Sequence, residues 1–135
     1  MASKKKFCGG CGKRIDVNSV CECRKKAAAE GSKRSKDKFK QNHPEVYKAI
    51  NSKRWRDKRL HIIRRDKGHC QRCKIRFSLI NTDNLEVHHI KAKTLFPEKI
   101  FEDLNLITLC RTCNLQLGQN GIDFYWKPEE YEYNL

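Results

Sequence analysis

Two adjacent histidines, His88 and His89, stand in the apolar stretch from Val87 to Ile90, whose β-branched residues are typical of a strand. A neutral imidazole can bind a divalent cation or accept a proton near pH 7. A His-His pair alone is weak evidence, because histidines are often structural or lie on the surface. This pair gains weight from the Cys-x-x-Cys pairs that precede and follow it. We therefore take the stretch as a candidate reaction centre.

The eight cysteines of the chain form four close pairs. Two pairs that supply four thiolates are the usual ligand set of a structural zinc ion. We predict one structural zinc site around the histidines, with the ligands Cys70, Cys73, Cys110 and Cys113. We predict a second one in an amino-terminal zinc knuckle over residues 1–23, with the ligands Cys8, Cys11, Cys21 and Cys23. Free thiols are the alternative for both sets.

Metal explains these cysteines better than disulfides do. The amino-terminal sequence lacks the apolar run of a secretory signal, and no stretch approaches the length of a membrane span. We therefore expect a cytoplasmic protein with no membrane partner, in a reducing compartment where structural disulfides are rare. With 135 residues and a mean hydropathy of -0.84, the chain has a small core that metal would help to hold together.

The net charge of +14 is concentrated in the first part of the chain. Residues 1–80 hold 25 Lys and Arg against 7 acids, whereas residues 81–135 hold 5 against 9. Such a block is typical of a surface that binds a polyanion, most commonly nucleic acid, although a solvated charged surface is the alternative. The residues that we expect to contact DNA phosphates are Lys25, Lys26, Lys33, Arg34, Arg54, Lys58 and Arg65.

The basic stretch after the knuckle is predicted as a linker over residues 24–51. Between residues 24 and 40 it has no hydrophobic period and holds eight Lys and Arg against two acids, so we expect it to be flexible or only partly helical. Pro44 fits the first turn of a short helix at the end of this linker.

A longer helix is predicted from a Ser52 cap to about Asp66, with Trp55 on its apolar face as a core anchor. Gly68 is placed to end that helix. Two strands, over residues 85–90 and 104–109, then flank a loop that contains Pro97. The second strand leads into a helix from Cys110 to about Leu117.

Residues 119–135 form an acidic tail that is rich in aromatic residues. A segment of this composition is too aromatic for an exposed coil, so it either folds back over the core or docks another protein. Its aromatic residues are Phe124, Tyr125, Trp126, Tyr131 and Tyr133.

Five motifs occur in an order that resembles the small HNH endonucleases, especially those of phages and prophages. The resemblance covers roughly residues 52–118, which we take as the nuclease core. Its motifs are Trp55-Arg56, the run from Arg65 to Cys73, Val87-His88-His89-Ile90, the run from Asn105 to Cys110, and Cys113-Asn114.

The resemblance implies an α+β fold of the ββα-metal kind, in which a β-hairpin and a helix hold one catalytic divalent cation. By this comparison His88 is a metal ligand, His89 is the general base and Asn105 steadies the loop that carries the base. Asn114 stands where the family usually has its last histidine, which makes this an HNN variant with a weaker, neutral metal ligand. Mg²⁺, Mn²⁺ and Ni²⁺ are the candidate catalytic cations.

The function that the resemblance implies is hydrolysis of phosphodiester bonds in double-stranded DNA, by nicking or cutting, with low sequence specificity. A link to phage genome packaging in a host cytoplasm, with terminase or packaging proteins as partners, is implied in the same way. The alternative is a zinc-stabilised DNA-binding accessory protein without catalysis, since the change at Asn114 weakens the metal site.

One geometric demand comes with the two histidines. Neighbouring side chains in a regular strand point to opposite faces. For His88 and His89 to serve one site, the strand must therefore end, twist or bulge at this point.

Overall fold

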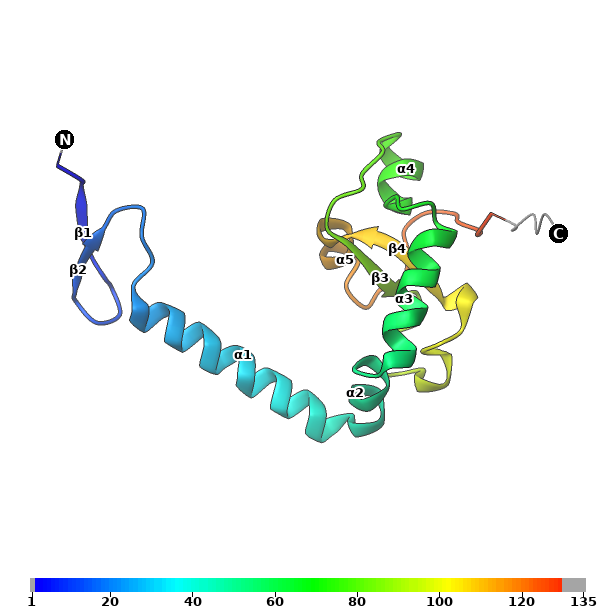
Figure 1. Cartoon of the computed structure of the whole chain (residues 1–135), viewed down its shortest axis with the longest axis horizontal. Coiled ribbons are helices and arrows are strands. Elements are labelled where there is room, and N and C mark those ends of the chain that lie inside the picture. Colours follow the sequence, from blue (N-terminus) through cyan, green and yellow to red (C-terminus); the bar gives the residue numbers. More distant parts are fainter. Residues whose placement is uncertain (1, 130–135) are drawn as a thin grey trace. The chain divides into compact units, whose positions relative to one another are not determined.

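The computed structural model describes residues 2–129 of the chain, which divides into two compact units between Asn42 and His43. The first unit holds a two-stranded hairpin and one helix (Figure 1). Their bounds are β1 Lys5–Phe7, β2 Arg14–Asp16 and α1 Glu22–Asn42. The two units are described separately below.

The hairpin of the first unit carries the predicted knuckle. Strands β1 and β2 pair antiparallel, with Lys6 opposite Ile15. The connection between them turns tightly: Cys8 N donates to Lys13 O at 2.8 Å, and Gly12 N donates to Cys8 O at 2.8 Å. Gly12 has a φ of +72°, a conformation in which a side chain would be strained, so glycine is required at this turn.

Helix α1 differs from our prediction of a flexible or partly helical linker. It is one continuous helix of 21 residues with no buried side chain. Three consecutive alanines and many Lys and Arg residues have high helix propensity, and Glu22 pairs with Lys25 at 2.7 Å in the first turn. The missing hydrophobic period therefore meant a helix exposed on all sides, not the absence of a helix.

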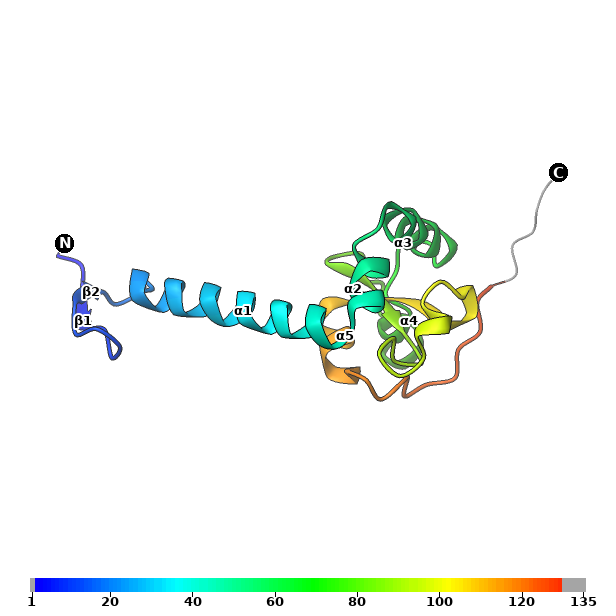
Figure 2. The ribbon, with the colours of Figure 1, turned by 90° about the horizontal axis from the view of Figure 1, so that it is seen from below.

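The second unit is built on an antiparallel hairpin of strands β3 and β4, in which Leu85 pairs with Cys110 and His89 with Leu106. Helices α3 and α5 pack on opposite sides of this hairpin (Figures 1 and 2). The bounds in this unit are α2 Pro44–Ile50, α3 Lys53–Arg65, α4 Gln71–Phe77, β3 Leu85–His89, η1 Pro97–Lys99, η2 Asp103–Asn105, β4 Leu106–Cys110 and α5 Arg111–Leu117.

The predicted caps of α3 are confirmed. Ser52 Oγ accepts from Trp55 N at 3.1 Å at the start of the helix, and Asp66 is the C-cap. Gly68 follows with a φ of +67°. The short helix α2, which we had grouped with the linker, lies in the second unit, where it packs on α3 and buries Val46.

The α+β class is confirmed, with β4 at the centre of the core. All five residues of β4 are buried, and Ile62 of α3 is fully buried as well. The sequence analysis missed α4, because the residues from Gln71 onward had been read only as the first half of a metal site. It also missed the two short 3₁₀ helices, η1 and η2, in the loop between the strands.

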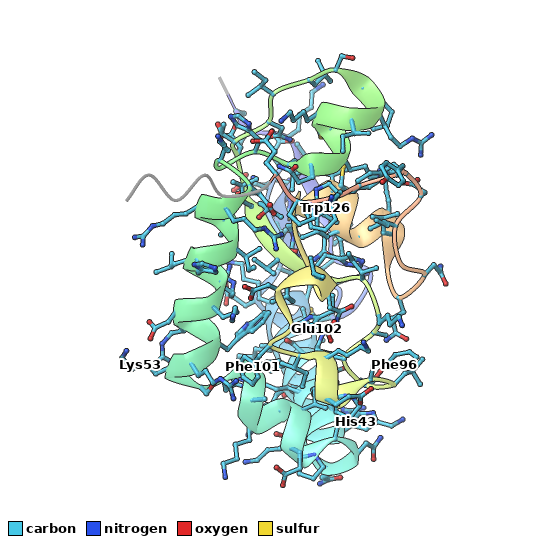
Figure 3. The ribbon with its side chains drawn as sticks, turned by 90° about the vertical axis from the view of Figure 1, so that its right-hand side faces the viewer. His43, Lys53, Phe96, Phe101, Glu102 and Trp126 are labelled. Atoms are coloured by element: carbon cyan, nitrogen blue, oxygen red, sulfur yellow. The ribbon has the colours of Figure 1, made fainter. Side chains whose placement is uncertain are left out.

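The described part of the tail, residues 119–129, folds back over the core. Ile122, Phe124 and Trp126 pack against the buried cluster that includes the four cysteines. Trp126 Nε1 donates to Gln71 Oε1 at 3.3 Å, and Trp126 is labelled in Figure 3. Tyr125 is exposed. Tyr131 and Tyr133 lie outside the described residues.

Among residues 2–129, none of the helices has the length and apolar character needed to cross a membrane.

Candidate active site and metal centres

The four cysteines of the second unit form a closed cluster. Their sulfur atoms all lie within 4.8 Å of one another, and all four residues are buried. Cys73 Sγ is 3.7 Å from Cys113 Sγ and 3.9 Å from Cys110 Sγ. Four thiolates around one zinc ion with bonds of about 2.3 Å would lie about 3.8 Å apart, so this cluster fits structural zinc.

The two halves of this cluster have the same local geometry. Cys70 and Cys110 are the N-caps of α4 and α5, and each sulfur accepts from the backbone N–H three residues later, at 3.4 and 3.5 Å. A helix that starts directly after the first cysteine of each Cys-x-x-Cys pair points N–H groups at the thiolates, which stabilises their negative charge.

The cysteines of the knuckle form the second cluster. Their sulfurs also lie within 4.8 Å of one another, with 3.5 Å between Cys8 and Cys23 and 3.5 Å between Cys11 and Cys21. The backbone N–H groups of Cys11 and Gly10 lower the pKa of Cys8 to about 6, which favours its thiolate form. The single residue between Cys21 and Cys23 therefore does not prevent a four-thiolate arrangement.

Arg72 connects the cysteine cluster of the second unit to the tail. Its Nη1 donates to Cys113 Sγ at 3.6 Å and to Gln116 Oε1 at 2.5 Å. Its guanidinium also pairs with Asp123, with Nε to Oδ1 at 3.1 Å and Nη2 to Oδ2 at 2.9 Å. The sequence analysis gave Arg72 no role, because nothing in its spacing indicated a contact with a zinc ligand.

His88 lies between α5 and the tail. Its Nδ1 is 2.8 Å from Asn114 Oδ1, and its Nε2 is 3.0 Å from the backbone carbonyl of Gly121. Both partners are acceptors. In the tautomer that donates from Nε2 to the Gly121 carbonyl, the lone pair of Nδ1 faces the amide oxygen of Asn114.

This pair of atoms fits a divalent cation. In this tautomer two lone pairs lie 2.8 Å apart and repel each other, and a divalent cation beside them would relieve the repulsion. Adjacent ligands of an octahedral ion with bonds of about 2.1 Å lie about 3 Å apart. The predicted metal ligands, His88 and Asn114, are thus brought together with their donor atoms side by side.

His89 occupies a different environment on the opposite side of β3. Its ring stacks on Trp55 of α3, and its Nε2 is 3.2 Å from the carbonyl of Ile100. Burial, together with the charge of Lys93, lowers the pKa of His89 to about 4, although the bond to Ile100 opposes this shift. The ring is therefore neutral at pH 7.

Asn105 holds the loop that follows His89. Its side-chain oxygen accepts from Lys91 N at 2.7 Å, and its Nδ2 donates to Lys91 O at 3.2 Å and to Lys99 O at 3.1 Å. Its own carbonyl accepts from Ile90 N at 2.8 Å. These bonds fix the backbone shortly after His89, at Lys91, and directly before Ile100, whose carbonyl contacts the His89 ring.

The geometric demand on the two histidines is met only in part. Strand β3 ends at His89, but the ladder is regular through both residues, with His88 opposite Ile107 and His89 opposite Leu106. There is no bulge, and the two rings contact different elements on opposite faces. The imidazoles therefore do not meet each other.

Asn114 is the residue that reaches both sides. It contacts His88, and it also lines an open hollow of about 290 Å³ together with His89. Two cations that the sequence analysis did not select, Arg59 and Lys93, line the same hollow. The full lining is Ile50, Trp55, Arg59, Glu86, Val87, His89, Lys93 and Asn114.

The position of Arg59 could have been found from the sequence, because it lies one helical turn after Trp55, on the side of α3 that faces the hairpin. Lys93 carries no such signal. It reaches the hollow from the irregular loop after β3, and burial lowers its pKa.

The predicted DNA contact of Arg65 is wrong. Its side chain is buried, pairs with Asp66 at 2.9 Å, and donates to the carbonyls of Asp103 and Leu106 at 2.7 and 2.6 Å. It supports the core and cannot reach a phosphate. The helical pattern failed here because a buried arginine that is fully bonded looks the same in the sequence as an exposed one.

The other predicted DNA contacts differ in how they are placed. Lys58 pairs with Asp103 at 2.6 Å, and the exposed Arg54 lies over the ring of Phe101 at 3.8 Å, next to α3 in Figure 3. The remaining four are exposed on α1, where Lys25 pairs with Glu22. They are Lys25, Lys26, Lys33 and Arg34. Their contact with DNA stays a prediction.

Residues 70–120 match the family model of the HNH endonucleases. The match begins at Cys70, includes His88, His89, Asn105 and Asn114, and ends just before Gly121. This stretch is therefore similar to an HNH endonuclease domain, as the sequence motifs predicted. No match was found among curated proteins or solved structures.

Proposed function

We propose that this chain is a metal-dependent HNH endonuclease that hydrolyses phosphodiester bonds in double-stranded DNA. The observation that carries the proposal is the hollow at the end of β3, where a neutral His89 and Asn114 lie beside two basic side chains. The two basic side chains can hold a phosphate there, while His89 activates the water that attacks it.

His89 is the general base. When its Nε2 donates to the carbonyl of Ile100, its Nδ1 keeps a lone pair that can take a proton from the attacking water. Trp55 and the carbonyl hold the ring in one orientation, so that no ordering of the base is needed during the reaction. Asn105 acts at one remove, by fixing the backbone around this base.

His88 and Asn114 are the residues that would hold the catalytic cation. A bound Mg²⁺, Mn²⁺ or Ni²⁺ would supply Lewis-acid chemistry to the phosphate and to the leaving 3′ oxygen. Lys93 and Arg59 neutralise the negative charge of the phosphate in the hollow. The products are DNA ends with a 5′-phosphate and a 3′-hydroxyl, as the family resemblance implies.

The protein binds the DNA backbone without contacts that distinguish the bases. Helix α1 presents basic side chains to solvent along its whole length, and such side chains favour contacts with phosphates. We therefore assign low sequence specificity. The two cysteine clusters hold structural zinc ions. A role in phage genome packaging, in a host cytoplasm and with terminase or packaging proteins as partners, rests on the family resemblance alone.

The test is cleavage of supercoiled plasmid by the full chain, loaded with zinc, in a series of Mg²⁺, Mn²⁺ and Ni²⁺. We expect nicked or linear products, and we expect His89→Ala to lower the rate by at least about 100-fold. His61→Ala, which removes an exposed histidine from α3, is the matched control. If the wild-type chain leaves the plasmid intact with every cation, or if His89→Ala cuts equally well, this assignment is wrong.

A second candidate function is DNA binding without catalysis. It is favoured by the neutral amide at Asn114 and by the two imidazoles on opposite faces of β3. Tight, salt-dependent DNA binding with no cleavage under any of these conditions would select it.

A further inference from the structure

Glu86 lies on the same face of β3 as His88, because the two residues are separated by one position in a regular strand. Its Oε2 accepts from Asn114 Nδ2 at 2.6 Å, and its Oε1 accepts from Arg111 Nη1 at 3.1 Å. Neither the sequence motifs nor the family resemblance drew attention to this residue.

The bond to Glu86 decides which half of the Asn114 amide faces His88. A carboxylate can only accept, so it binds the NH₂ group of the amide and turns the amide oxygen toward His88 Nδ1. Without Glu86, the amide could rotate by half a turn and present a donor to Nδ1. The site would then be satisfied by an ordinary hydrogen bond instead of a cation.

The charge of Glu86 matters as much as its geometry. The two ligands assigned to the cation, an imidazole and an amide, are both neutral, and neutral donors alone hold hard divalent cations weakly. Glu86 places a negative charge directly behind Asn114. Arg111 partly offsets that charge from the other carboxylate oxygen.

We propose that Glu86 is the anionic positioning residue of this metal centre: it orients Asn114 toward the cation and supplies the negative charge that the His88–Asn114 pair lacks. The inference rests on the proposed function for the location of the cation. It further implies that Glu86 biases the site toward Mn²⁺ and Mg²⁺, which prefer oxygen-rich, anionic surroundings, over Ni²⁺, which nitrogen donors hold well.

The test measures metal binding and does not depend on cleavage. Mn²⁺ is titrated into the zinc-loaded full chain, and free Mn²⁺ is followed by electron paramagnetic resonance. Glu86→Gln keeps the size of the side chain and removes its charge, so we expect Mn²⁺ affinity to fall by at least about tenfold, as for other groups that orient a metal ligand. Ni²⁺ affinity, measured by calorimetry, should fall less. Glu86→Asp, which keeps the charge, should retain more Mn²⁺ affinity than Glu86→Gln.

Two further variants make the result specific. Arg111→Gln removes the opposing charge and should tighten Mn²⁺ binding. Glu98→Gln, at an exposed acid on η1, is the matched control and should bind as the wild type does.

Equal Mn²⁺ affinity of Glu86→Gln and wild type overturns the inference, as does a wild-type chain that binds no Mn²⁺. If His88→Ala weakens Mn²⁺ binding and Glu86→Gln does not, the metal centre of the proposed function stands and only the role of Glu86 is lost. If Glu86→Gln weakens binding in a chain that never cuts DNA, Glu86 keeps its role and the nuclease assignment fails.

Discussion

The indole of Trp55 stacks on the imidazole of His89, with ring centroids 4.9 Å apart and an angle of 19° between the planes. The sequence analysis treated Trp55 as a core anchor, and it is buried as expected. The stacking gives it a second task, because the same contact that fills the space between α3 and the hairpin also fixes the ring of the proposed base. Stability and catalysis are therefore coupled at this residue.

Trp55→Ala should damage both properties. Loss of a buried indole costs about 3 kcal/mol of the free energy of unfolding, measured by urea denaturation. Plasmid cleavage should fall by at least about tenfold under conditions where the variant is folded, since the base is no longer held in place. Trp55→Phe keeps an aromatic face against His89 and should retain most of both. A folded Trp55→Ala variant that cuts at the wild-type rate would contradict the coupling.

A buried zinc ligand and the tail are joined through Arg72. Because Asp123 orients the guanidinium that donates to Cys113, Asp123→Asn should weaken this contact. We expect zinc to pass to a colorimetric chelator about tenfold faster than from the wild type, as for other residues that support metal ligands. Asp83→Asn, an exposed acid before β3, is the control. Identical release rates for both variants would show that the tail does not protect the zinc.

The buried pair of Arg65 and Asp66 leads to a third prediction. Arg65→Gln leaves Asp66 buried without its partner, so the free energy of unfolding should fall by about 3 kcal/mol. Arg64→Gln, at the exposed neighbour, should change stability little and serves as the control. The salt dependence of DNA binding should be the same for folded Arg65→Gln and wild type. A reduced salt slope would instead restore Arg65 as a phosphate contact.

The features that could be predicted from the sequence are those that depend on residues close together in the chain. The cap at Ser52 and the start of α5 after Cys110 depend on residues three positions apart, so their pattern is visible in the sequence. Helix α4 starts after Cys70 in the same way, but this segment had been read only as part of a metal site. The residue pattern likewise predicted the two strands, which lie at Leu85–His89 and Leu106–Cys110, within two residues of the expected ranges.

The parts that were missed depend on contacts between distant segments. The role proposed for Glu86 depends on its hydrogen bond with Asn114, and the carbonyl of Gly121 matters because it contacts His88. Neither contact has a signal in the sequence. The burial of Arg65 depends on carbonyls of Asp103 and Leu106, about 40 residues away in the chain. Residue type alone could not separate this arginine from those on the surface.

The last prediction concerns helix α1. Because a helix places its side chains at fixed angles, the basic residues of α1 form rows that a flexible linker would not have. With about 100° of rotation per residue, Lys26, Lys33 and Lys36 fall within one quarter of the helix circumference. Such a row can follow one phosphate backbone. Replacing all three with glutamine, a good helix former, should reduce the magnitude of the negative slope of log K against log salt for DNA binding by about 2.7, or about 0.9 for each lost phosphate contact.

The measurement is DNA affinity over a range of salt concentrations, by fluorescence anisotropy with a labelled duplex. The matched control changes the same three lysines to arginine, which keeps the charge and the helix, and its slope should equal that of the wild type. Circular dichroism confirms that α1 is still formed in both variants. If the glutamine variant keeps the wild-type slope, this row of lysines does not touch the phosphates. The next variants to test are then Arg59→Gln and Lys93→Gln, because these two residues line the hollow beside His89.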